Sequence, residues 1–185
     1  MLSLVITGNP GVGKHTIGKY IAKTLDLNLI DLNQIAIDEK IFEEKNKSKD
    51  VNVSKLKKIL KTKLDKKSLV IGHLAPYVLT KSQVKKLIIL RKNPYKLSAI
   101  YKKRKYSKNK IRENIESEIL GIIAHDAFKK LDKSKIVQID TTGKSIQKVV
   151  LQTKNAIKGK KKSDGVDWLS LVSENNDLKK FFSYD

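Results

Sequence analysis

The chain has 185 residues, of which 39% are hydrophobic and 32% are charged. This length suits one globular domain with its own core and is too short for two large ones. The absence of cysteine excludes disulfide scaffolds, thiolate nucleophiles and cysteine zinc sites. No apolar run approaches the roughly 20 residues of a membrane-spanning helix, and the first residues lack the basic region of a signal peptide. We therefore expect a cytoplasmic protein without a membrane partner.

The formal net charge is +21. A field of this sign attracts polyanions such as RNA or a ribosome, although a solvated lysine surface without a partner is the alternative. Arginine is rare and confined to one stretch, at Arg91, Arg104 and Arg112. Because a planar guanidinium pairs with phosphate in a bidentate way, we expect this cluster to belong to a phosphate site. Structural ion pairs are the alternative explanation for the cluster.

Strands and helices are expected to alternate along the first 157 residues, from short apolar runs and from apolar residues at helical spacing. The expected strands are 2–7, 27–31, 68–71, 84–90 and 135–140. The expected helices are 15–25, 33–44, 54–64 with Ser54 as N-cap, one that starts at Asn93, 107–131 and 145–157. Residues 45–52 are polar and are expected to form a mobile loop. The alternation predicts an α/β fold with a parallel sheet and helices on both faces.

The last segment, 158–185, is expected to lie outside this domain. Residues 158–162 (KGKKK) resemble a flexible basic linker, and apolar anchors follow at Trp168, Phe181 and Phe182. This tail either folds back on the core or docks on a partner. Folding back is the simpler expectation.

The most specific motif is the segment 8–16 (GNPGVGKHT), which follows an expected strand and precedes an expected helix. Its glycines let backbone N–H groups surround phosphate oxygens, and the helix N-terminus adds a positive dipole end. Lys14 is placed to reach the β- and γ-phosphates of ATP. His15 stands where the usual P-loop has a Ser or Thr that helps to hold Mg²⁺, and Thr16 follows with a hydroxyl. Because Mg²⁺ prefers oxygen ligands, we expect His15 to pack or to contact phosphate instead.

A basic segment after residue 90 resembles a lid. Arg104 lies between two expected helices, where it could close over the phosphates, screen developing charge and exclude water. The alternative is a basic helical hairpin without a catalytic role.

Four segments together carry a family resemblance: the P-loop, residues 70–74, the lid, and residues 139–145. Their order and spacing resemble the small adenylate kinase family of archaea and eukaryotic nuclei. This is a dual kinase/ATPase group whose eukaryotic member is the coilin-interacting nuclear ATPase protein. The similarity covers roughly residues 1–155, and residues 165–169 of the tail also resemble archaeal members.

The resemblance implies a P-loop NMP-kinase domain over 1–157, with an NMP-binding segment at about 30–53 and a lid at about 103–113. In this family Thr16 would hold Mg²⁺, and Lys144 would lie beside the adenine. The residues implied to bind ATP are Gly11, Gly13, Lys14, His15, Thr16, Arg104 and Lys144. The resemblance also implies AMP as the favoured acceptor. A small-subunit ribosomal protein or pre-ribosomal particle is the implied partner, during late rRNA maturation.

Three positions depart from the family pattern. Ile71 stands where members carry an acidic residue, which would hold Mg²⁺ through water and orient the attacking group. Asp31 or Asp38 could supply a substitute oxygen. Lys105 replaces a glycine after the lid arginine, and Ile100 or a neighbour replaces a further arginine.

The first hypothesis is a nucleoside-monophosphate kinase in which Lys14, Arg104 and His73 are catalytic. His73 follows an expected central strand, where side chains face the nucleotide crevice, although a structural histidine is the alternative. The second hypothesis is a ribosome-assembly ATPase switch with little kinase activity. The third is a P-loop kinase of another small metabolite or of a nucleic-acid end.

Overall fold

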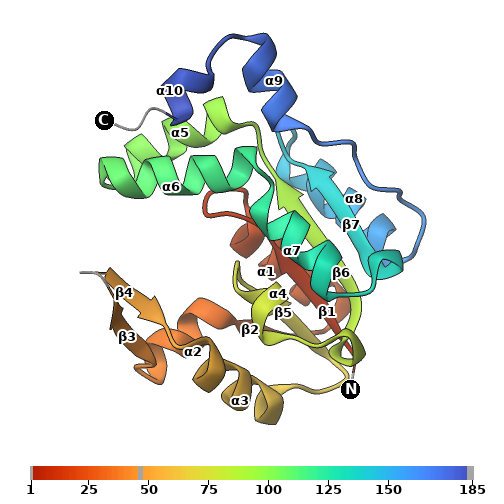
Figure 1. Cartoon of the computed structure of the whole chain (residues 1–185). Helices are drawn as coiled ribbons and strands as arrows, with labels where there is room; N and C mark the ends of the chain where they lie inside the picture. The colour runs from red at the N-terminus through yellow and green to blue at the C-terminus, as the bar shows by residue number, and fades with distance from the viewer. Residues whose placement is uncertain (1, 46–47, 183–185) are drawn as a thin grey trace.

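The computed structural model describes residues 2–45 and 48–182. Its centre is a five-stranded sheet in the order β2-β5-β1-β6-β7, in which every neighbouring pair is parallel (Figure 1). The strands are β1 (Ser3–Thr7), β2 (Asn28–Asp31), β5 (Ser68–Ile71), β6 (Val84–Arg91) and β7 (Ile136–Asp140). β1 and β5 are buried along their whole length, as expected for a parallel sheet covered on both faces. The predicted α/β fold is confirmed.

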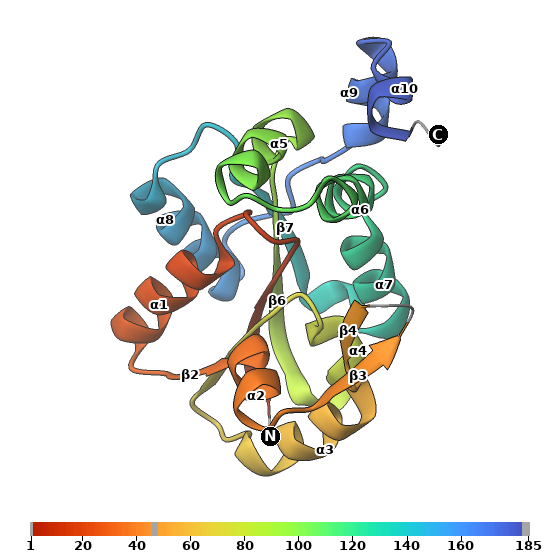
Figure 2. The ribbon, with the colours of Figure 1, turned by 90° about the vertical axis from the view of Figure 1, so that its left-hand side faces the viewer.

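Helices cover both faces of this sheet and form two apolar clusters. One cluster includes side chains of α1 (Lys14–Leu25), α5 (Pro94–Lys103), α6 (Lys108–Ile119) and α8 (Ile146–Ile157). The other includes side chains of α2 (Leu32–Asp38), α3 (Val53–Lys63), α4 (Ala75–Val78) and α7 (Ile122–Lys130). Figure 2 shows α1 and α8 on one side of the sheet and α7 on the other. Two short 3₁₀ helices, η1 (Lys81–Gln83) and η2 (Lys133–Lys135), precede β6 and β7.

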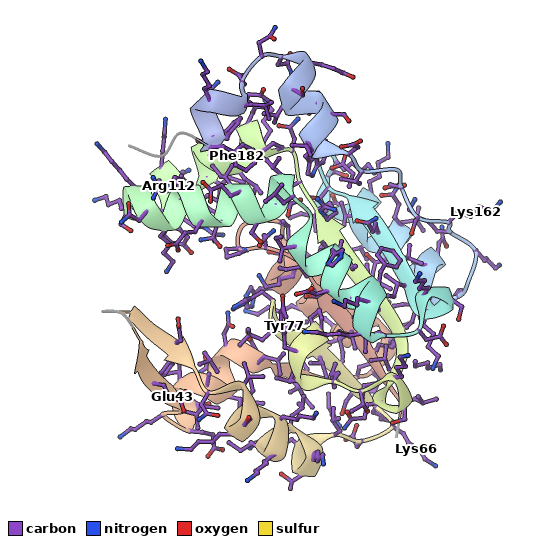
Figure 3. All side chains as sticks on the ribbon, viewed as in Figure 1. Glu43, Lys66, Tyr77, Arg112, Lys162 and Phe182 are labelled. Carbon is purple, nitrogen blue, oxygen red and sulfur yellow. The ribbon has the colours of Figure 1, made fainter. Side chains whose placement is uncertain are left out.

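A β-hairpin stands where a helix end and a loop were expected. α2 ends at Asp38, Lys40 adopts φ 50°, and the chain then forms β3 (Phe42–Lys45) and β4 (Ser48–Val51). The two strands are antiparallel, with Glu43 opposite Asp50. The predicted helix to residue 44 and loop over 45–52 are therefore wrong, and residues 46–47 lie outside the described part. Figure 3 shows Glu43 on the β3–β4 hairpin, opposite Arg112 of α6.

Two predicted helix boundaries are also corrected. The helix expected over 107–131 divides at Gly121, whose φ of 63° favours glycine. A Cβ at this position would lie 3.4 Å from a guanidinium nitrogen of Arg91. α3 is capped by Asn52, whose side chain accepts from the Lys55 N–H at 2.8 Å, and not by Ser54.

The tail folds back on the core, as the simpler expectation had it. α9 (Trp168–Glu174) and α10 (Leu178–Phe182) bring Val172 and Phe181 into the cluster that contains α5 and α6. The Tyr95 hydroxyl donates to Asp177 at 2.7 Å, and the Tyr95 ring meets Phe181 edge-on at 5.2 Å. The boundary at residue 157 stays a prediction. Within the described residues, no helix is long and apolar enough to span a bilayer.

Candidate active site

The P-loop connects β1 to α1 and takes the conformation that its glycines allow. Gly11 and Gly13 have φ values of 83° and 103°, and Gly13 caps α1. Gly8 has no room for a side chain, because a Cβ there would lie 2.3 Å from the Leu90 carbonyl oxygen. The loop therefore directs backbone N–H groups and the N-terminus of α1 toward one site, an arrangement that binds phosphate.

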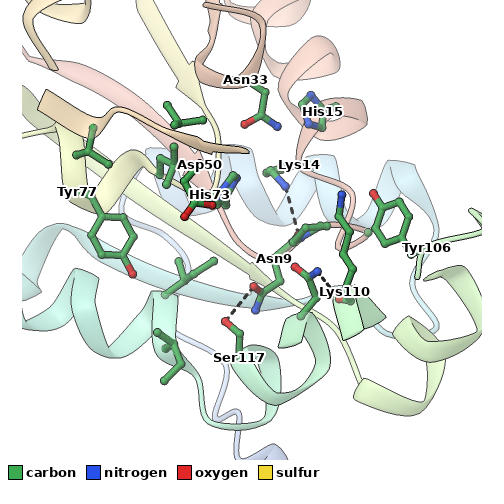
Figure 4. A pocket seen from close by; sticks show the side chains of 18 of the residues that line it. Asn9, Lys14, His15, Asn33, Asp50, His73, Tyr77, Tyr106, Lys110 and Ser117 are labelled. Atoms are coloured by element: carbon green, nitrogen blue, oxygen red, sulfur yellow. Dashed lines mark hydrogen bonds between the residues drawn. The ribbon is translucent and has the colours of Figure 1, made fainter. Parts of the chain in front are cut away.

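This site is a cavity of about 1000 Å³ (Figure 4). Its volume is at the upper end of the roughly 300–1,000 Å³ of ligand pockets. One wall comes from the P-loop and the lid side: Asn9, Pro10, Gly11, Gly13, Lys14, His15, Thr16, Arg104, Tyr106, Lys110, Asn114 and Ser117. The opposite wall comes from the α2–α3 region, and the floor from residues after β5: Asn33, Glu43, Asp50, Val51, Asn52, Val53, Ser54, His73, Leu74 and Tyr77. The remaining lining residues are Ile122 and Ile123 of α7.

Lys14 is 3% exposed and lies in the phosphate wall. Its ammonium donates to the Asn9 carbonyl oxygen at 3.3 Å. Burial lowers the Lys14 pKa to about 8, the nearby Arg104 charge acts in the same direction, and Asp31 opposes them. An anion bound here would favour the protonated ammonium, so the site is electrostatically suited to phosphate.

His73 follows β5 and lines the cavity. Burial lowers its pKa to about 4, and the charges of Lys14 and His15 add to this effect. The imidazole is therefore neutral near pH 7 and offers one donor and one acceptor without charge. Its predicted position at the nucleotide crevice agrees with the cavity, and its role in the reaction stays a prediction.

His15 and Thr16 both line the cavity at the start of α1. His15 Nδ1 lies 2.8 Å from Asp31 Oδ2, so this histidine joins α1 to the end of β2. Asp31 Oδ1 accepts from the Asn33 N–H at 2.9 Å and so caps α2. This contact was not expected from the sequence, because its partners belong to different elements.

The three arginines do not form one phosphate site. Arg104 lines the cavity at the end of α5. Arg91 is buried, and its Nε lies 2.8 Å from Glu118 Oε1. Arg112 lies on α6, 3.9 Å from Glu116, outside the cavity lining. The expectation of a shared phosphate role is therefore wrong for Arg91, where the ion-pair alternative holds, and among the three only Arg104 reaches the cavity.

The amino-acid sequence is similar to that of known proteins. Residues 4–121 match a family described as "AAA domain". A protein of Pyrococcus furiosus named "Putative adenylate kinase" is 32% identical over 92% of this chain and 93% of its own length. A protein of the same name from Methanocaldococcus jannaschii is 32% identical over 99% of this chain and 97% of its own. The chain belongs to this adenylate kinase family.

Solved structures support the same architecture. Shikimate kinase from Aquifex aeolicus has a TM-score of 0.58 at 16% identity, over 85% of this chain and 97% of its own. Thymidylate kinase from Candida albicans has a TM-score of 0.52 at 13% identity, over 85% and 91%. At these identities the likeness concerns the fold of P-loop kinases alone.

The structure describes the surroundings of two positions, Lys105 and Ile71, that depart from the expected family pattern. Lys105 adopts φ 54°, a region that favours glycine, which agrees with the glycine that the resemblance leads us to expect there. Asp31 is the strand partner of Ile71, so a carboxylate stands beside the position where the family acid is missing. Asp38 instead accepts from Gln34 at 2.7 Å on an exposed part of α2. Neither substitute lines the cavity, but Asp31 contacts His15, which does, and its charge acts on Lys14.

Lys144 lies apart from the cavity lining. Its ammonium contacts Gln152 at 3.2 Å and Asp164 of the tail at 3.3 Å. The loop that carries it nevertheless touches the P-loop, because the Thr141 hydroxyl donates to the Val12 carbonyl at 3.1 Å. Its placement beside adenine therefore stays a prediction.

Several cavity residues were not singled out from the sequence. They are Asn9, Asn33, Glu43, Asp50, Tyr77, Tyr106, Lys110 and Ser117. Asn9 lies inside the P-loop motif and could have been found there. Asn33, Glu43 and Asp50 fall within the predicted monophosphate-binding segment 30–53, and Tyr106 and Lys110 fall within the predicted lid 103–113, but no local pattern distinguished them there. Tyr77 and Ser117 lie outside both segments.

Proposed function

We propose that the protein is a nucleoside-monophosphate kinase that transfers the γ-phosphate of ATP to AMP. The observation that supports this proposal best is the buried Lys14 ammonium at the P-loop, facing a cavity of about 1000 Å³ whose other wall is a separate hairpin. A cavity with a phosphate wall and a distinct second wall suits a donor and an acceptor held face to face.

The phosphate wall would act mainly through positioning and charge. The P-loop N–H groups and Lys14 would hold the β- and γ-phosphates, and Arg104 would stabilise the transferring group. The bond between the γ-phosphorus and its bridging oxygen breaks, a bond to an acceptor phosphate oxygen forms, and ADP leaves. The attacking oxygen is already anionic, so the reaction needs no strong base and is compatible with a neutral His73.

The opposite wall would recognise the acceptor. Asn33 and Ser54 offer hydrogen bonds to a base or ribose, while Glu43 and Asp50 make this wall acidic. The acceptor's phosphate would therefore point toward Lys14 and Arg104. This arrangement supports the assignment of the segment 30–53 to monophosphate binding.

Magnesium would enter with the phosphates. Among the described residues, no group of three or more His, Asp or Glu side chains could hold a metal ion. Mg²⁺ bound with nucleotide needs only one or two protein oxygens. The Thr16 hydroxyl, and the Asp31 carboxylate through water, are the groups that would hold it. When bound, the ion would supply positive charge that offsets the negative charge of the phosphates.

Asp31→Asn tests this magnesium assignment. The amide keeps the cap on α2 but removes the charge, so the Mg²⁺ concentration for half-maximal ATP binding should rise by about tenfold, or roughly 1.4 kcal/mol. Calorimetric titration of ATP at stepped Mg²⁺ concentrations measures this. Asp38→Asn on the same helix is the control and should leave the Mg²⁺ dependence unchanged. Equal behaviour of the two variants would exclude Asp31.

A second candidate function is an ATPase switch in small-subunit ribosome assembly. The net charge of +21 supports contact with rRNA or a pre-ribosomal particle, and the family resemblance supports a ribosomal protein partner. Both functions could use one nucleotide site.

Product analysis decides between these functions. The purified protein is incubated with Mg-ATP, with and without each of a panel of nucleoside monophosphates, and diphosphate formation is compared with hydrolysis. Lys14→Met purified in the same way controls for contaminating host kinase. Conversion of AMP well above the variant's background supports the kinase. Slow hydrolysis that no monophosphate changes would reject it and favour the switch.

A further inference from the structure

One buried carboxylate, that of Glu118, connects its own helix α6 to three other segments of the chain. Glu118 of α6 is 1% exposed. It accepts from Asn9 Nδ2 at 2.7 Å, Arg91 Nε at 2.8 Å, the Lys92 N–H at 3.0 Å and Trp168 Nε1 at 3.1 Å. These donors come from the P-loop, the end of β6 and the C-terminal tail. The carboxylate thus connects the nucleotide loop to the last part of the chain.

Asn9 is held firmly by α6. Its amide nitrogen donates to Glu118. Its amide oxygen accepts from the Ser117 hydroxyl at 3.2 Å, the bond drawn between these two residues in Figure 4. The Asn9 side chain therefore has both polar ends fixed by consecutive residues of one helix. We call the two side-chain bonds of Asn9, to Ser117 and to Glu118, the clamp. The backbone carbonyl oxygen of Asn9 accepts from the Lys14 ammonium, so the clamp is one residue away from the lysine of the phosphate wall.

The same helix also carries the lid side of the cavity. Lys110, Asn114 and Ser117 of α6 line the cavity along successive turns. A nucleotide that draws Lys14 away from the Asn9 carbonyl, or that attracts Lys110, would act on the helix that holds Glu118. The Trp168 indole N–H is bound to that carboxylate and would experience the change.

Stabilisation of the fold does not by itself explain why a buried carboxylate contacts both the P-loop and the tail. Burying the Arg91–Glu118 pair carries a desolvation cost that apolar side chains would avoid. Arg91 also donates to Gln138 at 2.8 Å and to the Glu118 carbonyl at 2.7 Å, so its charge is fully engaged without Asn9 or Trp168. The contacts of Glu118 with the P-loop and the tail are therefore additional to the ion pair.

We propose that Glu118 is a positioning residue that holds the P-loop through Asn9 and couples it to the tail through Trp168. Nucleotide binding at the loop then changes the environment of the indole. This inference deepens the proposed function, since it rests on ATP occupying the P-loop.

Trp168 is the only tryptophan in the chain, so its fluorescence reports this coupling directly. Mg-ATP is titrated into the full-length protein while Trp168 emission is recorded, and ATP binding is measured separately by equilibrium dialysis. In the wild type the emission should change along the dialysis binding curve. In Asn9→Ala the change at saturating ATP should fall at least about threefold, and kcat should fall about tenfold while the KM for ATP changes less than about threefold.

Tyr95→Phe is the matched control. It removes the hydrogen bond to Asp177 that ties the tail to α5, without touching Glu118. Its fluorescence response and kcat should equal those of the wild type. If Asn9→Ala does not fold, Ser117→Ala breaks the other end of the clamp and should shift both readouts in the same direction.

Three results would overturn the inference. ATP that binds by dialysis without changing wild-type emission would show that the tail does not sense the loop. A full fluorescence response and kcat in a folded clamp variant would show that Asn9 does not transmit the effect. No ATP binding by dialysis would reject the proposed function itself and the coupling with it.

Discussion

The two walls of the cavity differ in whether buried polar side chains lie at their base. In the P-loop wall, Asn9 and Lys14 are 4% and 3% exposed, and Glu118 behind them is 1% exposed. Arg104 and Lys110 of the same wall are exposed, as are Glu43 and Asp50 of the hairpin wall. Phosphoryl transfer depends on fixed charges in a site that excludes water, whereas acceptor binding needs access. We therefore expect the chemistry at the buried base of the first wall and acceptor recognition at the second.

Charge separates the walls as well. Lys14, Arg104 and Lys110 line the phosphate side, and Glu43 and Asp50 line the other. A field directed across the cavity would orient a monophosphate with its anionic end toward the P-loop. Variants of the first wall should therefore change the rate of transfer, and variants of the second should change acceptor affinity.

Lys14→Met should have the largest effect. Removing a cation that stabilises the transferring phosphate should lower kcat at least about 10²-fold to 10³-fold. The same change removes the desolvation cost that lowers the lysine pKa to about 8, so the free energy of unfolding should rise by about 1–3 kcal/mol. Steady-state kinetics and urea unfolding measure the two effects. Full activity would refute the P-loop assignment.

Arg104→Lys should follow in size. A lysine keeps the charge but loses the bidentate geometry, so kcat should fall at least about tenfold, or about 1.4 kcal/mol. Arg112→Lys is the matched control, since Arg112 lies outside the cavity lining, and its kinetics should match the wild type. An unchanged rate in Arg104→Lys would show that the lid arginine is not catalytic.

The pH dependence of ATP binding should reveal the buried lysine. In the free protein, Lys14 loses its proton around pH 8, below its ordinary value of 10.5. Bound phosphate favours the ammonium, so binding takes up a proton and ATP affinity should fall about tenfold between pH 7 and pH 9. Calorimetry at pH 8 in two buffers of different ionisation enthalpy should show uptake of about half a proton. Lys14→Met should abolish this uptake; its persistence there would assign it to another group.

The local sequence pattern was sufficient to predict the P-loop in the phosphate wall. It was not sufficient to predict the hairpin in the acceptor wall. The strand, glycine loop and helix around residues 8–16 are adjacent in sequence, and the structure confirms their order. β3 and β4 were missed because their sequences, FEEK and SKDV, are mostly polar and lack strand propensity.

Long-range pairs account for the errors within the site. Arg91 was assigned to phosphate because its partner Glu118 is 27 residues away and no local spacing joins them. Asp31 lies next to the site, in contact with His15, because β2 pairs with β5 in a register that places it opposite Ile71. Chain patterns predict elements, but which buried charge meets which is decided only when the elements pack.

Glu43→Gln is the smallest and most specific test of the acceptor wall. The Glu43 carboxylate accepts from the Asn52 side chain, and glutamine keeps an oxygen for that bond while removing the charge. Because an exposed charge contributes only about 0.2–1 kcal/mol, the KM for AMP should fall by about twofold to threefold as repulsion of its phosphate decreases.

The kcat and the ATP affinity of Glu43→Gln should not change, because the phosphate wall is intact. Glu39→Gln removes a charge outside the cavity lining and controls for a general change of field. An increase in kcat, or the same KM shift in Glu39→Gln, would mean that the two walls do not act separately. If only the KM for AMP changes, and only in Glu43→Gln, the acceptor binds at the hairpin. A monophosphate bound elsewhere in the cavity would not lie against the Glu43 carboxylate.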